Sequence, residues 1–156
     1  MHTSLHRFLS EWRYIEGMSL NLPSRGTYVL VIVLRRPIIV RVGRLGRLSF
    51  KRGVYVYVGT ARRGLGPRIR RHLAKRKRLH WHIDWVTSCR AFEVCEVWVS
   101  ETLGIECKLA TELIRQADGF VPRFGSSDCR CRSHFVYISC GRKEGALHRL
   151  GLLRVI

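Results

Sequence analysis

The chain has 156 residues, 46% of them hydrophobic and 10% aromatic, a length and composition that suit one domain with a packed core and exclude wholesale disorder. Lys and Arg number 29 against 11 Asp and Glu, and the resulting net charge of +18 favours a polyanionic partner. No apolar run reaches the roughly 18–20 residues of a membrane span and no secretion signal is present, so we expect a cytoplasmic, nucleoid-associated protein without membrane contact.

Residues 4–16 carry apolar side chains at helical spacing, which predicts a short amphipathic helix. Two interpretations of this helix stay open: it docks on another surface, or it is a misassigned extension and translation starts at Met18. We therefore divide the chain into an N-terminal extension (1–22), one domain (23–141) and a C-terminal tail (142–156).

Three β-rich segments follow. The apolar, β-branched run Gly26–Leu34 predicts a buried strand. After a turn, residues 38–42 predict a second strand that pairs back on the first. Residues 54–59 predict a third strand, in which the side-chain period of two sends Tyr55 and Tyr57 to the same face.

The pattern then changes to helical. Pro67 suits the first turn of a helix, in which Arg68 and His72 lie four residues apart and share one face. Residues 80–86 form a short aromatic element that the pattern assigns to neither helix nor strand.

Three more elements are predicted within residues 91–138. Residues 91–99 alternate well enough for a strand that leaves Glu93 and Glu96 largely outside. Residues 104–117 have one apolar stripe and predict a helix, and the segment that ends at Ile138 predicts a final strand. This order of elements describes an α/β (α+β) fold, with a small central mixed or antiparallel sheet of three or more strands flanked by helices.

The basic charge is concentrated in one half of the sequence. Residues 17–83 contain 17 Lys or Arg and no acidic residue, whereas residues 84–156 contain 10 basic and 9 acidic residues. Because a concentration of positive charge neutralises phosphates well, we expect nucleic acid as the partner. The alternative is that the charge only serves solubility, as in the basic proteins of thermophiles or ribosomes. The residues expected to contact nucleic acid surround the helix after Pro67: Arg62, Arg63, Arg70, Arg71, Lys75, Arg76, Lys77 and Arg78.

Six cysteines occur in the chain. Without a secretion signal we expect free thiols rather than a disulfide framework. The spacing Cys129-x-Cys131-x-x-His134 offers three zinc ligands, but structural zinc sites more often combine two Cys-x-x-Cys knuckles, and no second knuckle occurs. We therefore do not expect zinc.

Two tyrosine-bearing segments, Gly26-Thr27-Tyr28 and Tyr57-Val58-Gly59, stand at the ends of adjacent predicted strands. These two segments, in this order along the chain, resemble the two signature motifs of the GIY-YIG endonuclease superfamily. The resemblance covers about residues 26–138. The chain is most similar to a subfamily catalogued as a domain of unknown function, which shares the stretches GVYVYVGTA, RIRRHL, HWHIDW, ECKLA and FGSSDCRC. That subfamily occurs fused to helix-hairpin-helix DNA glycosylases in some genomes, which implies a DNA-repair context and a DNA glycosylase as a further partner.

The resemblance implies a GIY-YIG-like fold and assigns a role to five residues. Tyr28 and Tyr57 match the two signature tyrosines, and Arg68 matches the arginine of the first helix. His72 stands where many members have Tyr or His, and Glu106 falls at the spacing of the single metal-binding glutamate.

The chain departs from the family pattern at three places. Thr27 replaces the middle Ile of the first motif, and Thr60 stands where some members have a lysine. The two signature tyrosines are 29 residues apart, where many members have about ten residues between the motifs, so an extra hairpin or loop is expected within residues 35–53.

These residue types suit the hydrolysis of a phosphodiester bond. Nearby cations and a metal-bound water can lower the pKa of a phenol from its usual value of about 10, which would let Tyr28 or Tyr57 act as general base, assisted by His72. Arg68 would hold the scissile phosphate bidentately. Glu106 would hold one Mg²⁺ or Mn²⁺, with water and phosphate oxygens completing the coordination.

Two further polar clusters stand out. His80, His82 and Asp84 could ligate a second metal or join a DNA-binding wall with the neighbouring tryptophans, although a packed aromatic corner with polar tips is the favoured interpretation. Asp128 and His134 are expected to border the active face.

The sequence therefore predicts a metal-dependent DNA endonuclease that acts in repair or in the processing of damaged or branched DNA. A non-catalytic nucleic-acid-binding module with the same fold is the main alternative. An RNA- or ribosome-associated basic protein is a third interpretation.

Overall fold

The apolar run Gly26–Leu34 forms strand β1, near the middle of an antiparallel sheet in the computed structural model, which describes residues 22–156. The sheet has six strands in the order β6-β7-β4-β1-β5-β8, and a separate two-stranded sheet pairs β2 with β3. The expected helix over residues 4–16 and the alternative start at Met18 lie outside the described residues. An antiparallel sheet flanked by helices confirms the predicted fold class.

The elements follow one another in this order: β1 (Gly26–Leu34), β2 (Ile38–Arg41), the 3-10 turn η1 (Gly43–Leu45), β3 (Arg47–Phe50), β4 (Gly53–Ala61), α2 (Leu65–Leu73), α3 (His82–Ser88), β5 (Phe92–Ser100), α4 (Glu106–Gln116), β6 (Gly119–Phe120), β7 (Phe135–Tyr137), α5 (Cys140–Arg149) and β8 (Leu153–Arg154). The aromatic element that the sequence left unassigned is thus helix α3.

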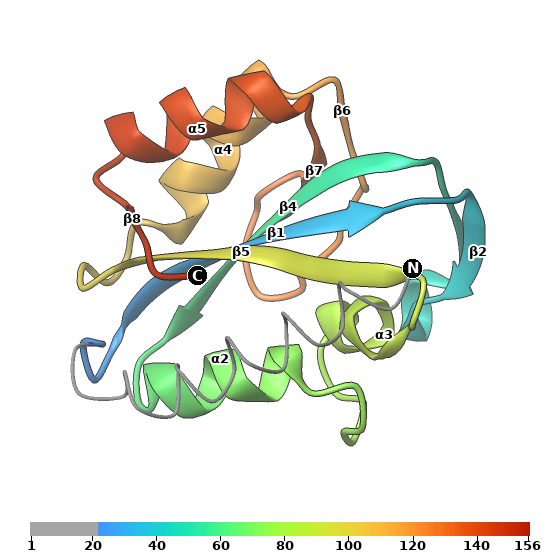
Figure 1. The fold of residues 1–156 in the computed structure, drawn as a ribbon, viewed down its shortest axis with the longest axis horizontal. Helices are drawn as coiled ribbons and strands as arrows, with labels where there is room; N and C mark the ends of the chain where they lie inside the picture. Colours follow the sequence, from blue (N-terminus) through green and yellow to red (C-terminus); the bar gives the residue numbers. More distant parts are fainter. Residues whose placement is uncertain (1–21) are drawn as a thin grey trace.

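Both faces of the sheet are covered, which explains why β1 has an unbroken apolar sequence. Leu30 and Ile32 belong to the core between the sheet and helices α2 and α3, whereas Val29 and Val31 belong to the core beneath α4 and α5. Figure 1 shows α4 and α5 on one side of the sheet and α2 and α3 on the other. The fold is therefore a three-layer sandwich.

The segment between the two signature motifs does not pair as predicted. Residues 38–42 were expected to pair with β1, but β2 pairs with β3, from Ile38 opposite Phe50 to Arg41 opposite Arg47. Strand β1 pairs instead with β4 along all nine residues, which leaves no edge on that side for β2. The extra hairpin or loop expected within residues 35–53 is a hairpin, which forms a small sheet of its own.

Strand β5 departs from regular alternation, and this corrects the expectation for Glu96. Val31 pairs with Glu96 and Ile32 with Val94, so Cys95 is an extra residue that forms a bulge. The bulge sends Glu96 to the face covered by α5, where its side chain is 13% exposed and forms an ion pair with Lys143. Glu96 is therefore largely inside.

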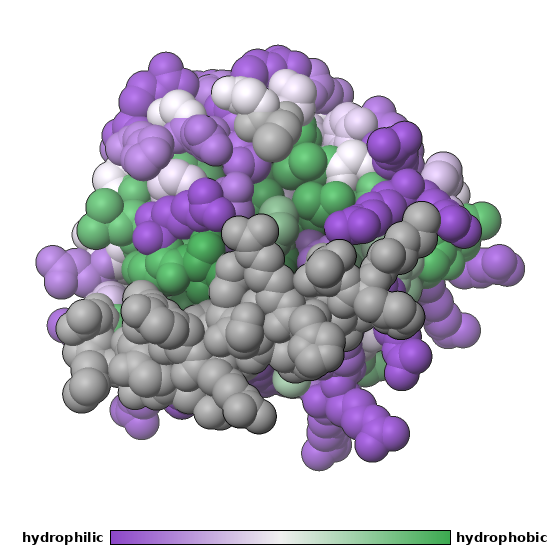
Figure 2. Space-filling view, viewed as in Figure 1, coloured by the Kyte–Doolittle hydropathy of each residue, from purple (hydrophilic) through white to green (hydrophobic). Residues whose placement is uncertain are grey.

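Residues 142–156, set apart above as a tail, contain most of α5 and all of β8. Ala146, Leu147 and Leu152 are buried in the core beneath α4 and α5, and β8 pairs with β5. In the view of Figure 2, hydrophilic side chains cover α5 and hydrophobic ones show beneath it. Among the residues that the structure describes, none of the helices has the length and apolar character needed to cross a membrane.

Candidate active site

Tyr28 and Tyr57 come together because of the register between β1 and β4. Tyr28 lies opposite Gly59 and Leu30 opposite Tyr57, so the period of two brings both tyrosines to the face covered by α2 and α3. Their ring centroids are 6.4 Å apart. A Cβ atom on Gly59 would lie 2.4 Å from the Tyr28 ring and hydroxyl, so the glycine of the second motif makes room for the tyrosine of the first.

His72 completes a buried pair with Tyr28. It lies on the inner face of α2, where it is 1% exposed, and its Nε2 is 2.6 Å from the Tyr28 hydroxyl. Burial, and after it the positive charges of Lys77, Arg68 and Arg71, lower the pKa of His72 to about 3. The imidazole is therefore neutral at physiological pH, and its Nδ1 has no hydrogen-bond partner among the described residues.

The surroundings of both phenols raise their pKa values, which corrects the expectation that nearby cations would lower them. Burial is the largest cause for Tyr28 and for Tyr57, and it outweighs the positive charge of Arg68, which acts in the opposite direction. Both phenols are thus protonated in the protein alone.

Arg68 is held in place by neutral groups. Its Nη1 donates to the carbonyl of Thr60, and its guanidinium lies 4.3 Å from the centroid of a Trp81 ring. No carboxylate among the described residues forms an ion pair with it. As far as residues 22–156 are concerned, the guanidinium can therefore take an anionic ligand without first breaking a salt bridge.

The Glu106 side chain reaches the region of Tyr28, Tyr57 and Arg68 from α4, which covers the other face of the sheet. Glu106 is the first residue of α4, and strand β7 pairs with β4 only at residues 55–57. Beyond Tyr57 the Val58 amide still donates to the carbonyl of His134, and Val58, His134 and Glu106 all line one cavity. One carboxylate oxygen of Glu106, Oε2, is buried and has no hydrogen-bond partner within residues 22–156. A buried carboxylate oxygen without a donor is a candidate ligand for a hard cation.

These side chains line one open cavity of about 740 Å³ at the end of the sheet where β1 begins, β4 ends and α2 starts (Figure 1). Tyr28, Tyr57, Arg68 and Glu106 all reach it, and His72 lies behind Tyr28. Arg62 and Arg63 are exposed at its rim. Four of the five residues that the resemblance singled out thus share one cavity, and the fifth touches it through Tyr28.

Three of the basic residues expected to contact nucleic acid make structural contacts with neighbouring residues. Lys75 Nζ donates to the carbonyls of Thr87, Cys89 and Phe92, which closes the end of α3. Lys77 Nζ donates to the carbonyl of His72 and to the Thr87 hydroxyl. Arg71 pairs with Asp84 at 2.7 Å. Within residues 22–156 the side chains of the others make no such contact: Arg62, Arg63, Arg76 and Arg78 are exposed and Arg70 is half-buried.

The cluster of His80, His82 and Asp84 does not converge on one point. Asp84 is fully buried, and its Oδ2 accepts from the backbone amides of His80 and Trp81, which caps the N-terminus of α3. His82 Nδ1 accepts from the backbone amide of Gly125. The packed aromatic corner is the interpretation that these contacts favour over a second metal.

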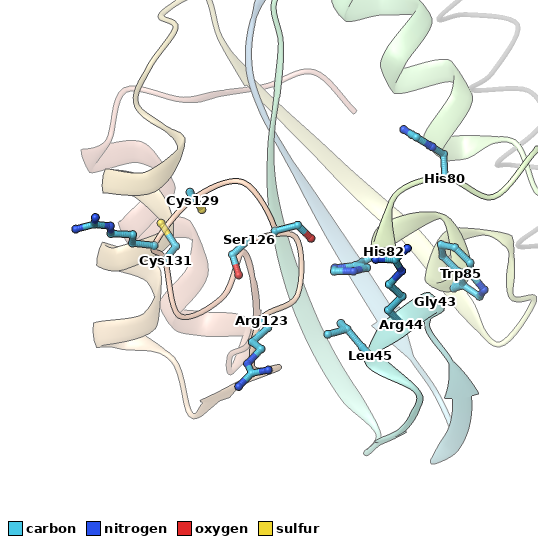
Figure 3. A pocket seen from close by; sticks show the side chains of 12 residues that line it. Gly43, Arg44, Leu45, His80, His82, Trp85, Arg123, Ser126, Cys129 and Cys131 are labelled. Carbon is cyan, nitrogen blue, oxygen red and sulfur yellow. The ribbon is translucent and has the colours of Figure 1, made fainter.

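A second cavity of about 700 Å³ adjoins the first and shares His80, His82 and Ser127 with it. In Figure 3 the side chains of Cys129 and Cys131 lie together on one side of it, across from His80, His82 and Trp85. Asp128 is exposed and His134 is buried, and both line the first cavity, as expected of residues that border the active face.

One residue beside this site was missed by the sequence analysis. Cys107 follows Glu106 in α4, and its thiol lies with Cys129, Cys131 and His134 in a group whose donor atoms are all within 4.8 Å of one another. The only signal was its position next to the predicted metal ligand, because Cys107 lies 22 positions before Cys129 in the sequence.

The chain matches a known protein family over most of its length. Residues 27–150 match the family described as Domain of unknown function DUF123. Comparisons with curated proteins and with solved structures gave no match.

Proposed function

We propose that this chain, which belongs to the DUF123 family, is a metal-dependent endonuclease that hydrolyses a phosphodiester bond in DNA. One observation carries the proposal: Tyr28, Tyr57, Arg68 and Glu106, which come from four different elements, line a single cavity rimmed by arginines. These are the residues to which the resemblance to GIY-YIG nucleases gives roles. A repair or processing context, with a DNA glycosylase as a further partner, is part of the proposal on the same resemblance.

The donor set fits one hard divalent cation. Glu106 offers a buried carboxylate oxygen without a partner among the described side chains, and Mg²⁺ binds through one or two carboxylates while water and substrate phosphate fill its other positions. When bound, such an ion supplies an activated water and neutralises charge on the phosphate. Mn²⁺ has the same preference for oxygen ligands.

Arg68 is the group that would bind the scissile phosphate. Its planar fork matches two phosphate oxygens, and its contacts with the Thr60 carbonyl and the Trp81 ring orient the fork without neutralising its charge. Arg62 and Arg63, at the rim of the cavity, would contact flanking phosphates. Charge that develops on the phosphorus oxygens would therefore meet fixed positive groups.

Tyr28 is the better candidate for the proton transfer because it already has an acceptor. As Tyr28 takes a proton from water, its own hydroxyl proton can pass to Nε2 of neutral His72, so no phenolate has to exist beforehand. Because the pKa of His72 is about 3, the imidazole is a weak acceptor and gives this proton up again at neutral pH. The hydroxide forms the new bond to phosphorus, the bond from phosphorus to the 3′ oxygen breaks, and that oxygen takes a proton from solvent. Tyr57 packs beside this pair and shapes the cavity.

The test is to incubate the purified full chain with nicked, abasic, flapped and branched DNA, with Mg²⁺, with Mn²⁺, and without added metal. We expect metal-dependent cleavage of at least one substrate, and a loss of at least about 100-fold in Arg68→Ala. Arg68→Lys should also cleave DNA poorly, because the point charge of lysine replaces the planar fork of the guanidinium. Arg47→Ala, an exposed change on the β2–β3 hairpin, is the matched control. DNA binding without cleavage of any substrate would contradict the proposal and favour a non-catalytic binding module.

A further inference from the structure

Four metal-ligating side chains gather where the loop between β6 and β7 meets the start of α4. They are the thiols of Cys107, Cys129 and Cys131 and the imidazole of His134, with all donor atoms within 4.8 Å of one another. We propose that these four residues bind one Zn²⁺ in a closed Cys₃His site that fastens the loop to α4. The inference does not depend on the proposed nuclease activity.

The spacing of the donor atoms suits a tetrahedral ion. Zn–S and Zn–N bonds of about 2.3 and 2.0–2.1 Å put neighbouring ligand atoms about 3.5–3.8 Å apart. The Cys129 sulfur and His134 Nε2 are already 3.4 Å apart. The soft thiolates and the imidazole also match the ligands that zinc prefers, and not those of Mg²⁺.

A backbone carbonyl determines which ring nitrogen of His134 carries the hydrogen. The Nδ1 atom of His134 lies 3.2 Å from the carbonyl oxygen of Val58. Because a carbonyl can only accept, Nδ1 must carry the proton, and Nε2 presents its lone pair toward Cys129. A zinc-binding histidine usually has this kind of support on its second nitrogen.

The zinc site also explains why the earlier expectation against zinc does not apply. That expectation rested on the absence of a second Cys-x-x-Cys knuckle, but a single remote residue, Cys107, supplies the fourth ligand without one. A disulfide would use only two of the three thiols and would leave the third thiol and the imidazole without a role. Cys107, Cys129 and Cys131 are free thiols.

A zinc ion here would position residues and would not react with substrate. Four protein ligands leave no open coordination position for water, which is typical of structural zinc. Cys107 is next to Glu106, and His134 is bonded through Val58 to the strand that carries Tyr57. The ion would thus connect α4, the loop and β4 beside the candidate active site.

The first measurement is the zinc content of the full chain, purified without a histidine tag and dialysed against metal-free buffer. We expect about one zinc per chain, and at least about a fivefold loss in Cys131→Ser and in His134→Gln. Cys95→Ser is the matched control, because Cys95 lies in β5, where its thiol donates to the Val31 carbonyl. That variant should keep its zinc.

Two measurements on the unchanged protein keep the test decisive if the variants fail to fold. Reconstitution with Co²⁺ should give thiolate-to-cobalt charge-transfer bands and the d–d bands of a tetrahedral site. Chelation should expose three thiols to alkylation and lower the melting temperature. A wild-type chain that contains no zinc, gives no cobalt spectrum and has thiols that react freely would overturn the proposal, as would a disulfide among these cysteines.

Discussion

The hydroxyl of Tyr28 and Nε2 of His72 form a 2.6 Å hydrogen bond between two almost fully buried side chains that are 44 residues apart in the sequence. Burial holds the pKa of Tyr28 above and that of His72 below its ordinary value, so both partners are neutral. Tyr28 lines the cavity that Arg68 and Glu106 also line, and His72 lies behind Tyr28.

Tyr28→Phe should impair both stability and activity. It removes the only hydrogen bond that His72 Nε2 makes within the described part of the chain, so the buried imidazole loses its partner. We expect the free energy of unfolding to fall by about 1–3 kcal/mol, measured in urea. Tyr55→Phe is the control: it loses a hydrogen bond to the Lys51 carbonyl but lies outside the cavity, so DNA cleavage should survive.

The low pKa of His72 predicts that stability falls with acid. The folded-state pKa is about 3, whereas the unfolded value is near 6.5, so the unfolded chain binds the extra proton between these values. Stability should be full above pH 6.5 and should fall by at most about 1.4 kcal/mol per pH unit as the pH drops toward 3.

His72→Gln should flatten that slope in urea unfolding measured at a series of pH values. His148→Gln, at an exposed position on α5, should keep it. An unchanged slope in His72→Gln would mean that His72 is not the residue responsible.

Gly59→Ala should damage the site while a nearby glycine tolerates the same change. The new Cβ would meet the Tyr28 ring and hydroxyl at 2.4 Å, and Tyr28 is too tightly packed to move aside. We expect a loss of about 1–3 kcal/mol or more in thermal or urea unfolding. Gly66→Ala, in the first turn of α2, meets no atom within 4 Å and should leave stability unchanged or slightly higher. Equal stabilities would argue against the close packing of the two motifs.

The basic residues of this face should separate into two groups. Lys75→Ala removes three hydrogen bonds at the end of α3, so it should cost about 1–3 kcal/mol of stability and change DNA affinity little. Arg62→Ala and Arg63→Ala should leave stability unchanged and weaken DNA binding, each with a smaller salt dependence of the affinity. The opposite pattern would show that the rim arginines are not the contact surface.

Much of the sheet could be predicted because its central strands have an unmistakable sequence. The continuous β-branched run of β1 and the alternating Tyr and Val of β4 indicate strands without any knowledge of their neighbours. Which strands pair with one another could not be predicted from the sequence in the same way. The residues of β2 indicate a strand but not its partner, and only the complete pairing of β1 with β4 decides that β2 and β3 form a separate hairpin.

The candidate site could be predicted as a set of residues but not in its electrostatics. Spacing and motif order selected Tyr28, Tyr57, Arg68 and Glu106, and these side chains do share a cavity. The balance between burial and nearby charge on each phenol depends on tertiary packing, and so does the capping role of Asp84. Cys107 was missed for a similar reason, because its partners come from a loop far along the chain.

The most direct measurement compares Glu106→Gln with wild type in two assays on the same DNA: Mg²⁺-dependent cleavage, and affinity without metal. Glu112→Gln, on the same helix, is the control. The account predicts that Glu106→Gln loses at least about 100-fold in cleavage and changes metal-free affinity by less than about twofold, because a neutral amide is a poor ligand for Mg²⁺. Cleavage by Glu106→Gln at the wild-type rate would contradict the account.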